Sequence, residues 1–267
     1  METKSISYNN SLIHYKVAGK GQPVFLIHGF AEDSRIWDGF IPELENDFLL
    51  VIPDIPGSGQ SALLEGNDIG IENYADVMNA IATQENISKA VFVGHSMGGY
   101  ISLAFAKKYP EKINAVGLFH SSAYADDDAK KETRQKAINV INEKGPLAFL
   151  KTAIPGLFAN AEASKVHIDD LLEKAKAFSN DALIQYYQAM IARPDTTQTL
   201  KSIQQPVLFI LGQHDKAVPF EHGLEQSHLP SLSHIHILRN SAHMGMLEEK
   251  EKSLGILAHF LHTIYVL

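Results

Sequence analysis

The sequence predicts an α/β fold, in which helices cover both faces of a mostly parallel sheet. Three observations predict it. Short apolar runs of strand length alternate with segments of helical spacing along most of the chain. A length of 267 residues is enough for one large α/β domain with a substantial core. Finally, one glycine-rich turn, residues 94–99, joins such a run to such a helix and contains the pattern G-x-S-x-G.

The N-terminal part begins with two stretches that alternate apolar and polar residues, with Asn9-Asn10 between them. This pattern predicts a β-hairpin at a sheet edge. Two continuous apolar runs follow, as expected of strands that are covered on both faces. The expected elements are hairpin strands 3–8 and 12–17, a strand at 23–27, a short helix at 34–44, a strand at 48–52 and a helix at 72–85.

The same alternation continues from the glycine-rich turn and returns near the C-terminus. Apolar runs predict strands at 89–93, 113–119, 206–211 and 234–238. Helical spacing predicts helices from the turn to residue 109, where Pro110 follows, and at 224–229 and 248–265.

The stretch 121–200 interrupts the alternation, because it contains helical segments and no strand pattern. The segments are 126–143, 147–158, 161–178 and 181–193. An insertion between parallel strands lies above their carboxyl ends, where such sheets bind ligands. We therefore expect a core of residues 1–120 and 201–267 and a helical lid over Ser96; a helical layer on a sheet face is the alternative.

Composition narrows the function. The formal charge is −8 and there is no dense Lys/Arg stripe, which argues against nucleic acid as a partner. The sequence has no cysteine, so disulfides, thiolate metal sites and a cysteine nucleophile are excluded. Neither a secretory signal nor an apolar run of ~18 residues is present, so no membrane association is expected. We expect a cytoplasmic monomer or homodimer acting on a small molecule.

Ser96 is the candidate nucleophile. In a strand-to-helix elbow the serine takes a strained backbone conformation, and its hydroxyl stands clear of the sheet. Gly94 and Gly98 suit so tight a turn because a Cβ would collide with neighbouring backbone. The N–H of Met97 lies at the helix N-terminus, where the dipole favours an oxyanion.

A serine needs a base, and the base needs an acid that orients it. Asp215 follows the strand at 206–211, and His243 follows the strand at 234–238. Both loops leave the sheet at the carboxyl edge, as the Ser96 turn does, so the three side chains can converge. Asp126 and Asp195, at the two ends of the insertion, are alternatives for the acid.

The oxyanion needs a second donor besides Met97, and the N–H of Phe30, after the strand at 23–27, is the candidate. Four histidines end strands near this edge and could line the site: His28, His95, His120 and His214. A metal cluster is not favoured, because no spacing such as H-E-x-x-H is present.

These residues together resemble the α/β-hydrolase superfamily over nearly the whole chain. The matching motifs are His28-Gly29-Phe30, Asp54-Ile55-Pro56-Gly57-Ser58-Gly59-Gln60-Ser61, Gly94-His95-Ser96-Met97-Gly98-Gly99, Gly212-Gln213-His214-Asp215 and Ala242-His243-Met244. The resemblance implies an eight-stranded sheet and a helical cap between its sixth and seventh strands. It also implies Ser96, Asp215 and His243 as the triad, and no cofactor.

The elbow argues against several branches of the superfamily. Epoxide hydrolases and haloalkane dehalogenases carry an aspartate where this chain has Ser96. Proline iminopeptidase-like members usually have tryptophan after the serine, where Met97 stands, and a relative in menaquinone biosynthesis usually has arginine at the position of Tyr100. An ester, thioester or C–C bond hydrolase remains.

We expect a serine hydrolase with carboxylesterase-like activity on a small acyl or aryl ester, because the candidate pocket is apolar and partly aromatic. The candidate pocket residues are Phe30, Trp37, His95, Tyr124, Phe149, Phe158, Tyr186, Tyr187, Met190 and Met244. A C–C bond hydrolase acting on an acid would need a cation, for which Arg193 is the candidate. A slow-turnover binding or signalling protein with the same triad is the third possibility.

Overall fold

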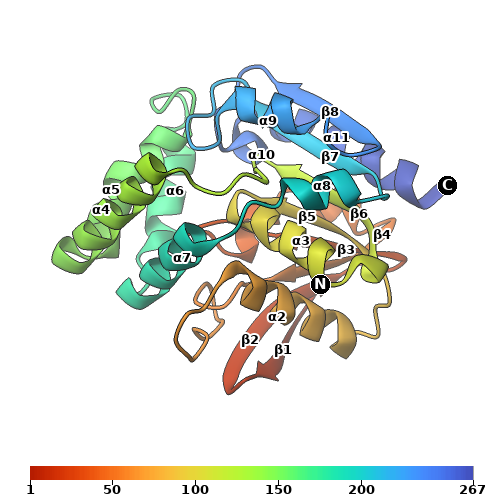
Figure 1. Ribbon diagram of the computed structural model, residues 1–267, viewed down its shortest axis with the longest axis horizontal. Coiled ribbons are helices and arrows are strands. Elements are labelled where there is room, and N and C mark those ends of the chain that lie inside the picture. The colour runs from red at the N-terminus through yellow and green to blue at the C-terminus, as the bar shows by residue number, and fades with distance from the viewer. Residues whose placement is uncertain (267) are drawn as a thin grey trace.

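The computed structural model describes residues 1–266, in which eight strands form one sheet in the order β1-β2-β4-β3-β5-β6-β7-β8 (Figure 1). The pairs from β4 to β8 along this order are all parallel, whereas β1–β2 and β2–β4 are antiparallel. The predicted mostly parallel α/β sheet is confirmed. The strands are β1 (Glu2–Tyr8), β2 (Ser11–Ala18), β3 (Gln22–Ile27), β4 (Phe48–Pro53), β5 (Ala90–His95), β6 (Ile113–Phe119), β7 (Val207–Gly212) and β8 (Ser233–Leu238).

The edge hairpin forms where the sequence predicts it. Asn9 and Asn10 have φ angles of 44° and 66°, the left-handed region that a two-residue hairpin turn requires. Asparagine tolerates this region better than most residues, which is why the pair can form the turn between the two strands.

Helices cover the central strands on both faces. Figure 1 shows α2 (Ile71–Gln84) and α3 (Met97–Lys108) on one face of the sheet and α11 (Lys250–Val266) behind it. Phe92 of β5 stacks on Phe25 of β3 with ring centroids 4.6 Å apart, and on Phe105 of α3 at 4.0 Å. These fully buried rings fix the height of α3 over the sheet, and with it the position of the turn before α3.

Some local expectations were wrong. The single helix expected at 34–44 is a 3₁₀ turn, η1 (Ser34–Trp37), followed by α1 (Ile41–Leu44). Asp33 caps η1 by accepting from the N–H of Arg35, and Pro42 begins a new turn. The helix expected at 224–229 starts earlier, as α9 (Phe220–Gln226), and the short α8 (Thr197–Ser202) and α10 (Gly245–Glu248) carry too few apolar positions to show a period.

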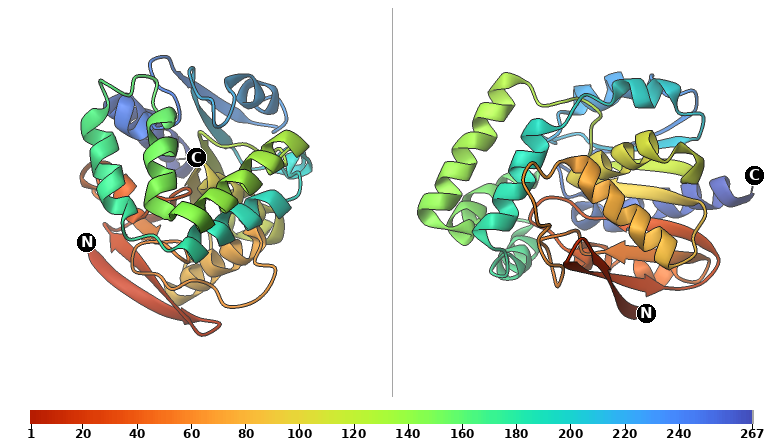
Figure 2. Two further views of the ribbon diagram at one scale, coloured as in Figure 1. Left: turned by 90° about the vertical axis from the view of Figure 1, so that its left-hand side faces the viewer. Right: turned by 60° about the horizontal axis from the view of Figure 1, so that its bottom comes forward.

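The chain between β6 and β7 is helical. Figure 2 shows its helices gathered at one end of the sheet. We call residues 121–200 the helical insertion. The N–H of Thr196 donates to the carbonyl oxygen of Ala123 at 2.8 Å, so the two ends of the insertion lie side by side. Its main elements are α4 (Asp128–Lys144), α5 (Pro146–Ala153), η3 (Ile154–Leu157), α6 (Lys165–Ala175) and α7 (Asn180–Ala192).

Candidate active site

Ser96 lies in a tight turn between β5 and α3. Its backbone has φ 50° and ψ −116°, a strained conformation for any residue with a side chain. A Cβ added to Gly94 would lie 2.0 Å from the carbonyl carbon of Gly98, and one added to Gly98 would lie 2.3 Å from the carbonyl oxygen of Ile27. Only glycine fits at these two positions, so the motif is required by the geometry of the turn.

Asp215 contacts His243, which lines the same cavity as Ser96. The Nδ1 of His243 lies 2.7 Å from Oδ2 of Asp215, while Oδ1 of Asp215 accepts from the N–H groups of Ala217 and Val218 at 2.8 and 2.9 Å. Burial alone would raise the pKa of Asp215, but the charge and hydrogen bond of His243 outweigh it and hold that pKa below its usual value. The carboxylate is therefore ionised and orients the imidazole.

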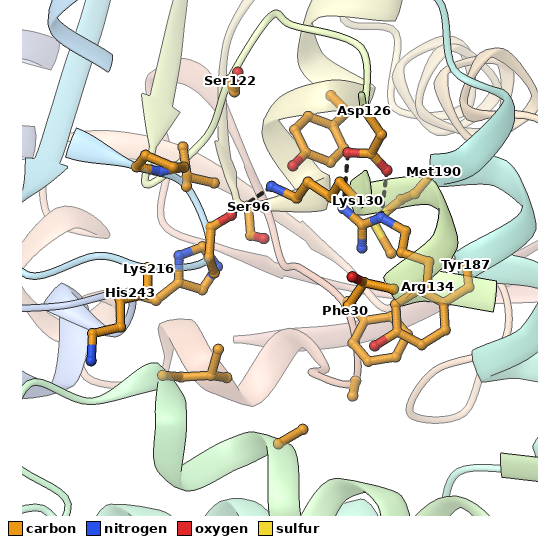
Figure 3. Close-up of a pocket in the computed structure, with 18 of the residues that line it drawn as sticks. Phe30, Ser96, Ser122, Asp126, Lys130, Arg134, Tyr187, Met190, Lys216 and His243 are labelled. Carbon is orange, nitrogen blue, oxygen red and sulfur yellow. Dashed lines mark hydrogen bonds and ion pairs between the residues drawn. The ribbon is translucent and has the colours of Figure 1, made fainter. Parts of the chain in front are cut away.

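Ser96 and His243 line the same cavity and lie near one another in Figure 3. Among residues 1–266, the Ser96 hydroxyl has no hydrogen-bond partner, so it is not engaged by another protein group. Catalytic hydrogen bonds between a nucleophile and its base are often long without substrate and tighten in the complex. The arrangement leaves the hydroxyl available to a bound carbonyl.

Two backbone N–H groups close to Ser96 along the chain or the cavity wall are the predicted oxyanion donors. Phe30 follows β3 and lines the cavity, and Met97 is the first residue of α3. In the described part of the chain neither N–H donates a hydrogen bond to another group. Free N–H groups at such a place can bind a developing oxyanion. The predicted donors are therefore unoccupied.

Glu32 and His95 form a buried ion pair that hydrogen-bonds to the loop of Gly29 and to the loop of His243. Glu32 Oε2 accepts from the N–H of Gly29 at 2.7 Å and lies 2.9 Å from Nδ1 of His95, whose Nε2 lies 2.9 Å from the carbonyl oxygen of His243. Both ring nitrogens of His95 thus face acceptors, so the imidazole is a cation with two donors. Burial opposes charge on both groups, but their mutual attraction lowers the pKa of Glu32 and raises the pKa of His95. The sequence identifies His95 as a site candidate but gives no sign of its partner Glu32.

His120 lies beside Asp215, the candidate acid. Its Nε2 accepts from the N–H of Gly245 at 3.1 Å, which places the proton of this neutral ring on Nδ1. Nδ1 is buried, has no hydrogen-bond partner among the described residues and lies 3.8 Å from Oδ2 of Asp215. Burial holds the pKa of His120 well below its usual value, so the ring adds a dipole and no charge beside Asp215.

The structure brings only some of the predicted pocket residues together. A cavity of about 790 Å³ opens at Ser96, and its walls include six of the predicted residues: Phe30, His95, Tyr124, Tyr187, Met190 and Met244. Trp37, Phe149, Phe158 and Tyr186 do not line it, so those four assignments were wrong. Trp37 is fully buried edge-on to Phe40 and Phe119, and Phe149 packs edge-on against Tyr187.

The other histidines and acids of the prediction have different surroundings. The Nε2 of buried His28 accepts from the N–H of Ile55 at 3.0 Å, and His214 is exposed to solvent. Asp126 binds two arginines, and exposed Asp195 accepts from the N–H of Thr197, so neither alternative acid reaches His243.

The cavity also contains cations that the prediction missed. Lys130 and Arg134 lie four residues apart on α4, so they share one face of that helix, and both line the cavity (Figure 3). The spacing of Asp126, Lys130 and Arg134 is visible in the sequence, but without the fold it gives no reason to connect this face with Ser96.

Within residues 1–266, no group of three or more His, Asp or Glu side chains is arranged to hold a metal ion. In the same residues no helix is both long and apolar enough to cross a membrane.

Comparison with known proteins agrees with this fold. The model of the family described as "alpha/beta hydrolase fold" matches residues 22–250. The 2-hydroxy-6-oxo-2,4-heptadienoate hydrolase of Pseudomonas putida is 23% identical over 91% of this chain and 90% of its own. A thermophilic esterase from Thermogutta terrifontis superposes with a TM-score of 0.90 at 25% identity, covering 99% of both chains. The enol-lactonase from Burkholderia xenovorans superposes equally well, with a TM-score of 0.90 at 21% identity over 97% of this chain and all of its own.

Proposed function

The chain belongs to the α/β-hydrolase family, and we propose that it is a serine hydrolase that cleaves small carboxylic esters through an acyl-enzyme on Ser96. The observation that carries the proposal is the 2.7 Å contact between His243 Nδ1 and Asp215 Oδ2, in a site where Ser96 and His243 line the same cavity. The similarity to an esterase at 25% identity supports the ester assignment.

The chemistry follows from the arrangement. His243 Nε2 takes the proton of the Ser96 hydroxyl as its oxygen attacks the ester carbonyl carbon, and Asp215 stabilises the imidazolium. The N–H groups of Phe30 and Met97 bind the oxyanion. The leaving alcohol takes the proton from His243, and water, activated by the same imidazole, then hydrolyses the acyl-enzyme to release the acid.

We also propose that the helical insertion acts as a cap that shapes the substrate site. The cavity is walled by residues of α4, α5 and η3 on one side and by Ser96 and His243 on the other. The N–H of His243 donates to the carbonyl oxygen of Leu157 at 2.9 Å, so the insertion directly supports the loop that carries the base.

Turnover of short p-nitrophenyl esters, with Ser96→Ala alongside, tests the proposal. We expect hydrolysis that a fluorophosphonate stops by labelling Ser96, and a loss of activity in the variant. An intact enzyme that is neither labelled nor active would favour a ligand-binding protein on the same fold. Turnover that survives Ser96→Ala would show that another residue is the nucleophile.

A second candidate is hydrolysis of a C–C bond in a β-diketone-like acid, which the similarity to a heptadienoate hydrolase favours. Such a reaction needs a cation that binds the substrate carboxylate, and the structure makes Arg193 a poor candidate for it. Arg193 donates to the carbonyl oxygens of Met190 and Tyr124 and pairs with Asp126, so three of its five N–H donors are already used. Turnover of such an acid that exceeds turnover of every ester tested would select this second function.

A further inference from the structure

We infer that the substrate carries a carboxylate, and that Arg134 binds it with the help of Lys130 while Ser96 attacks the ester carbonyl. The inference rests on the proposed function and names its substrate class: esters with a free carboxylate on the acyl or the alcohol part. It would distinguish this enzyme from an esterase for neutral esters.

Arg134 has N–H donors that no other group of the described residues accepts. Its Nε lies 2.5 Å from Oδ2 of Asp126, and its Nη2 is 3.4 Å from Oδ1. Within the same residues, Nη1 donates to no acceptor. The side chain is only 13% exposed and lines the cavity, so its remaining donors are sheltered from bulk water. A buried guanidinium with unused donors is suited to bind a planar anion.

The charges around Asp126 do not balance. Its side chain is fully buried and pairs with both Arg134 and Arg193, so two cations share one carboxylate. Arg193 is also held with its guanidinium carbon 4.0 Å over the ring of Tyr100, which fixes it as the structural partner of Asp126. The three side chains together carry one net positive charge beside the cavity, and a net charge that is held away from water is costly.

Lys130 adds a second positive charge. Its Nζ donates to the carbonyl oxygen of Ala217 at 2.7 Å, and within residues 1–266 it forms no ion pair with a carboxylate. Figure 3 shows its ammonium group reaching toward the Ser96 side of the cavity.

The other acids on the cavity wall form no ion pair with Lys130 or Arg134 among the described residues. Glu32 pairs with His95, and Asp127 and Asp195 accept from the backbone N–H groups of Lys130 and Thr197. An anion that entered the cavity would therefore meet two cations of α4: Lys130, which has no carboxylate partner among the described residues, and Arg134, which shares its carboxylate partner with Arg193.

The rest of the wall limits the shape of the substrate. Part of the lining is aliphatic, which suits a short methylene chain between the ester and the carboxylate. These side chains are Leu150, Ile154, Leu157 and Leu171.

Matched ester pairs test the inference in the wild-type enzyme. Monoethyl glutarate and ethyl valerate differ at the end of the acyl chain, and 4-acetoxybutyrate and butyl acetate differ at the end of the alcohol. We expect kcat/KM for the anionic member of at least one pair to exceed that for its neutral partner by about tenfold or more, the range of a charge-assisted hydrogen bond. A preference for the neutral member in both pairs, or no preference, would overturn the inference.

Variants of α4 then identify the cation. Arg134→Gln should lower kcat/KM for the preferred anionic ester about 10- to 100-fold, and much more than for its neutral partner. Arg134→Lys should restore part of the selectivity. Lys136→Gln removes the same charge from the outer face of α4, where Lys136 is 71% exposed, and should leave the selectivity as in wild type. An equal loss with both esters in Arg134→Gln would show that Arg134 only holds Asp126.

Binding separates this inference from the proposed function. Calorimetric titration of Ser96→Ala with monoethyl glutarate and with ethyl valerate requires no turnover. Selective binding of the anion, lost in Ser96→Ala/Arg134→Gln, would support the carboxylate site even if wild type cleaved none of these esters. Equal or absent binding of both compounds, with esterase activity present, would reject the site and keep the hydrolase.

Discussion

His95 lies 2.9 Å from Glu32 in a fully buried pair that connects three loops of the active site. Glu32 accepts from the N–H of Gly29, next to the candidate oxyanion donor Phe30, and His95 donates to the carbonyl oxygen of the candidate base, His243. The pair therefore fixes the loop of Gly29 and Phe30 relative to the loop of His243.

Glu32→Gln should lower both stability and turnover. The amide keeps the shape of the side chain but leaves the imidazolium of His95 without its counter-ion, which costs about 3–5 kcal/mol in a buried pair. Slight displacement of the loops should lower kcat about 10- to 100-fold. Urea unfolding and steady-state kinetics measure the two effects, and exposed Glu43→Gln is the control. A variant as stable and active as that control would contradict the role of the pair.

The contribution of the pair should depend on pH. The lowered pKa of Glu32 means that its contribution is complete above the ordinary value of 4.5 and is lost as pH falls through the folded-state pKa. The raised pKa of His95 means that its contribution is complete below 6.5 and is lost as pH rises through the folded-state pKa. The difference in unfolding free energy between wild type and Glu32→Gln/His95→Gln should be largest between pH 4.5 and 6.5. A difference that is constant from pH 4 to 9 would contradict an ion pair.

Asp215→Asn should abolish most of the activity while the fold is kept. An amide in this place donates to His243 Nδ1 and forces the other tautomer, which cannot take the Ser96 proton, so kcat should fall on the order of 10⁴-fold. Asp195→Asn changes an alternative acid that accepts from the N–H of Thr197 and forms no ion pair with His243 among the described residues, and it should keep wild-type kcat. If Asp195→Asn proved the more damaging variant, the acid would have been assigned wrongly.

Two glycines should respond to alanine in opposite ways. A Cβ at Gly94 would lie 2.0 Å from the backbone of Gly98, so Gly94→Ala should cost about 3 kcal/mol or more through backbone strain. Gly255 lies inside α11 with no atom within 4 Å of an added Cβ, so Gly255→Ala should stabilise by about 0.5–1 kcal/mol. Thermal unfolding of both variants beside wild type provides the comparison, and a stable Gly94→Ala would mean that the elbow is less tight than described.

The sequence was sufficient to predict the sheet and the contact between Asp215 and His243, because both follow from short-range patterns. Strand runs fix the strands, and loops that leave one edge of a parallel sheet must converge. The pocket walls were harder to predict, since an aromatic residue such as Trp37 has the same pattern in a core as in a cavity. The Glu32–His95 pair joins residues 63 positions apart, and a contact between such distant positions leaves no local pattern in the sequence from which to predict it.

The hydrogen bond between Thr196 and Ala123 closes the helical insertion at its base. A segment whose two ends are fastened to each other can lengthen, shorten or be replaced without pulling on β6 or β7. Evolution, or an engineer, could therefore exchange the helices of the insertion together and leave Ser96, Asp215 and His243 where they are.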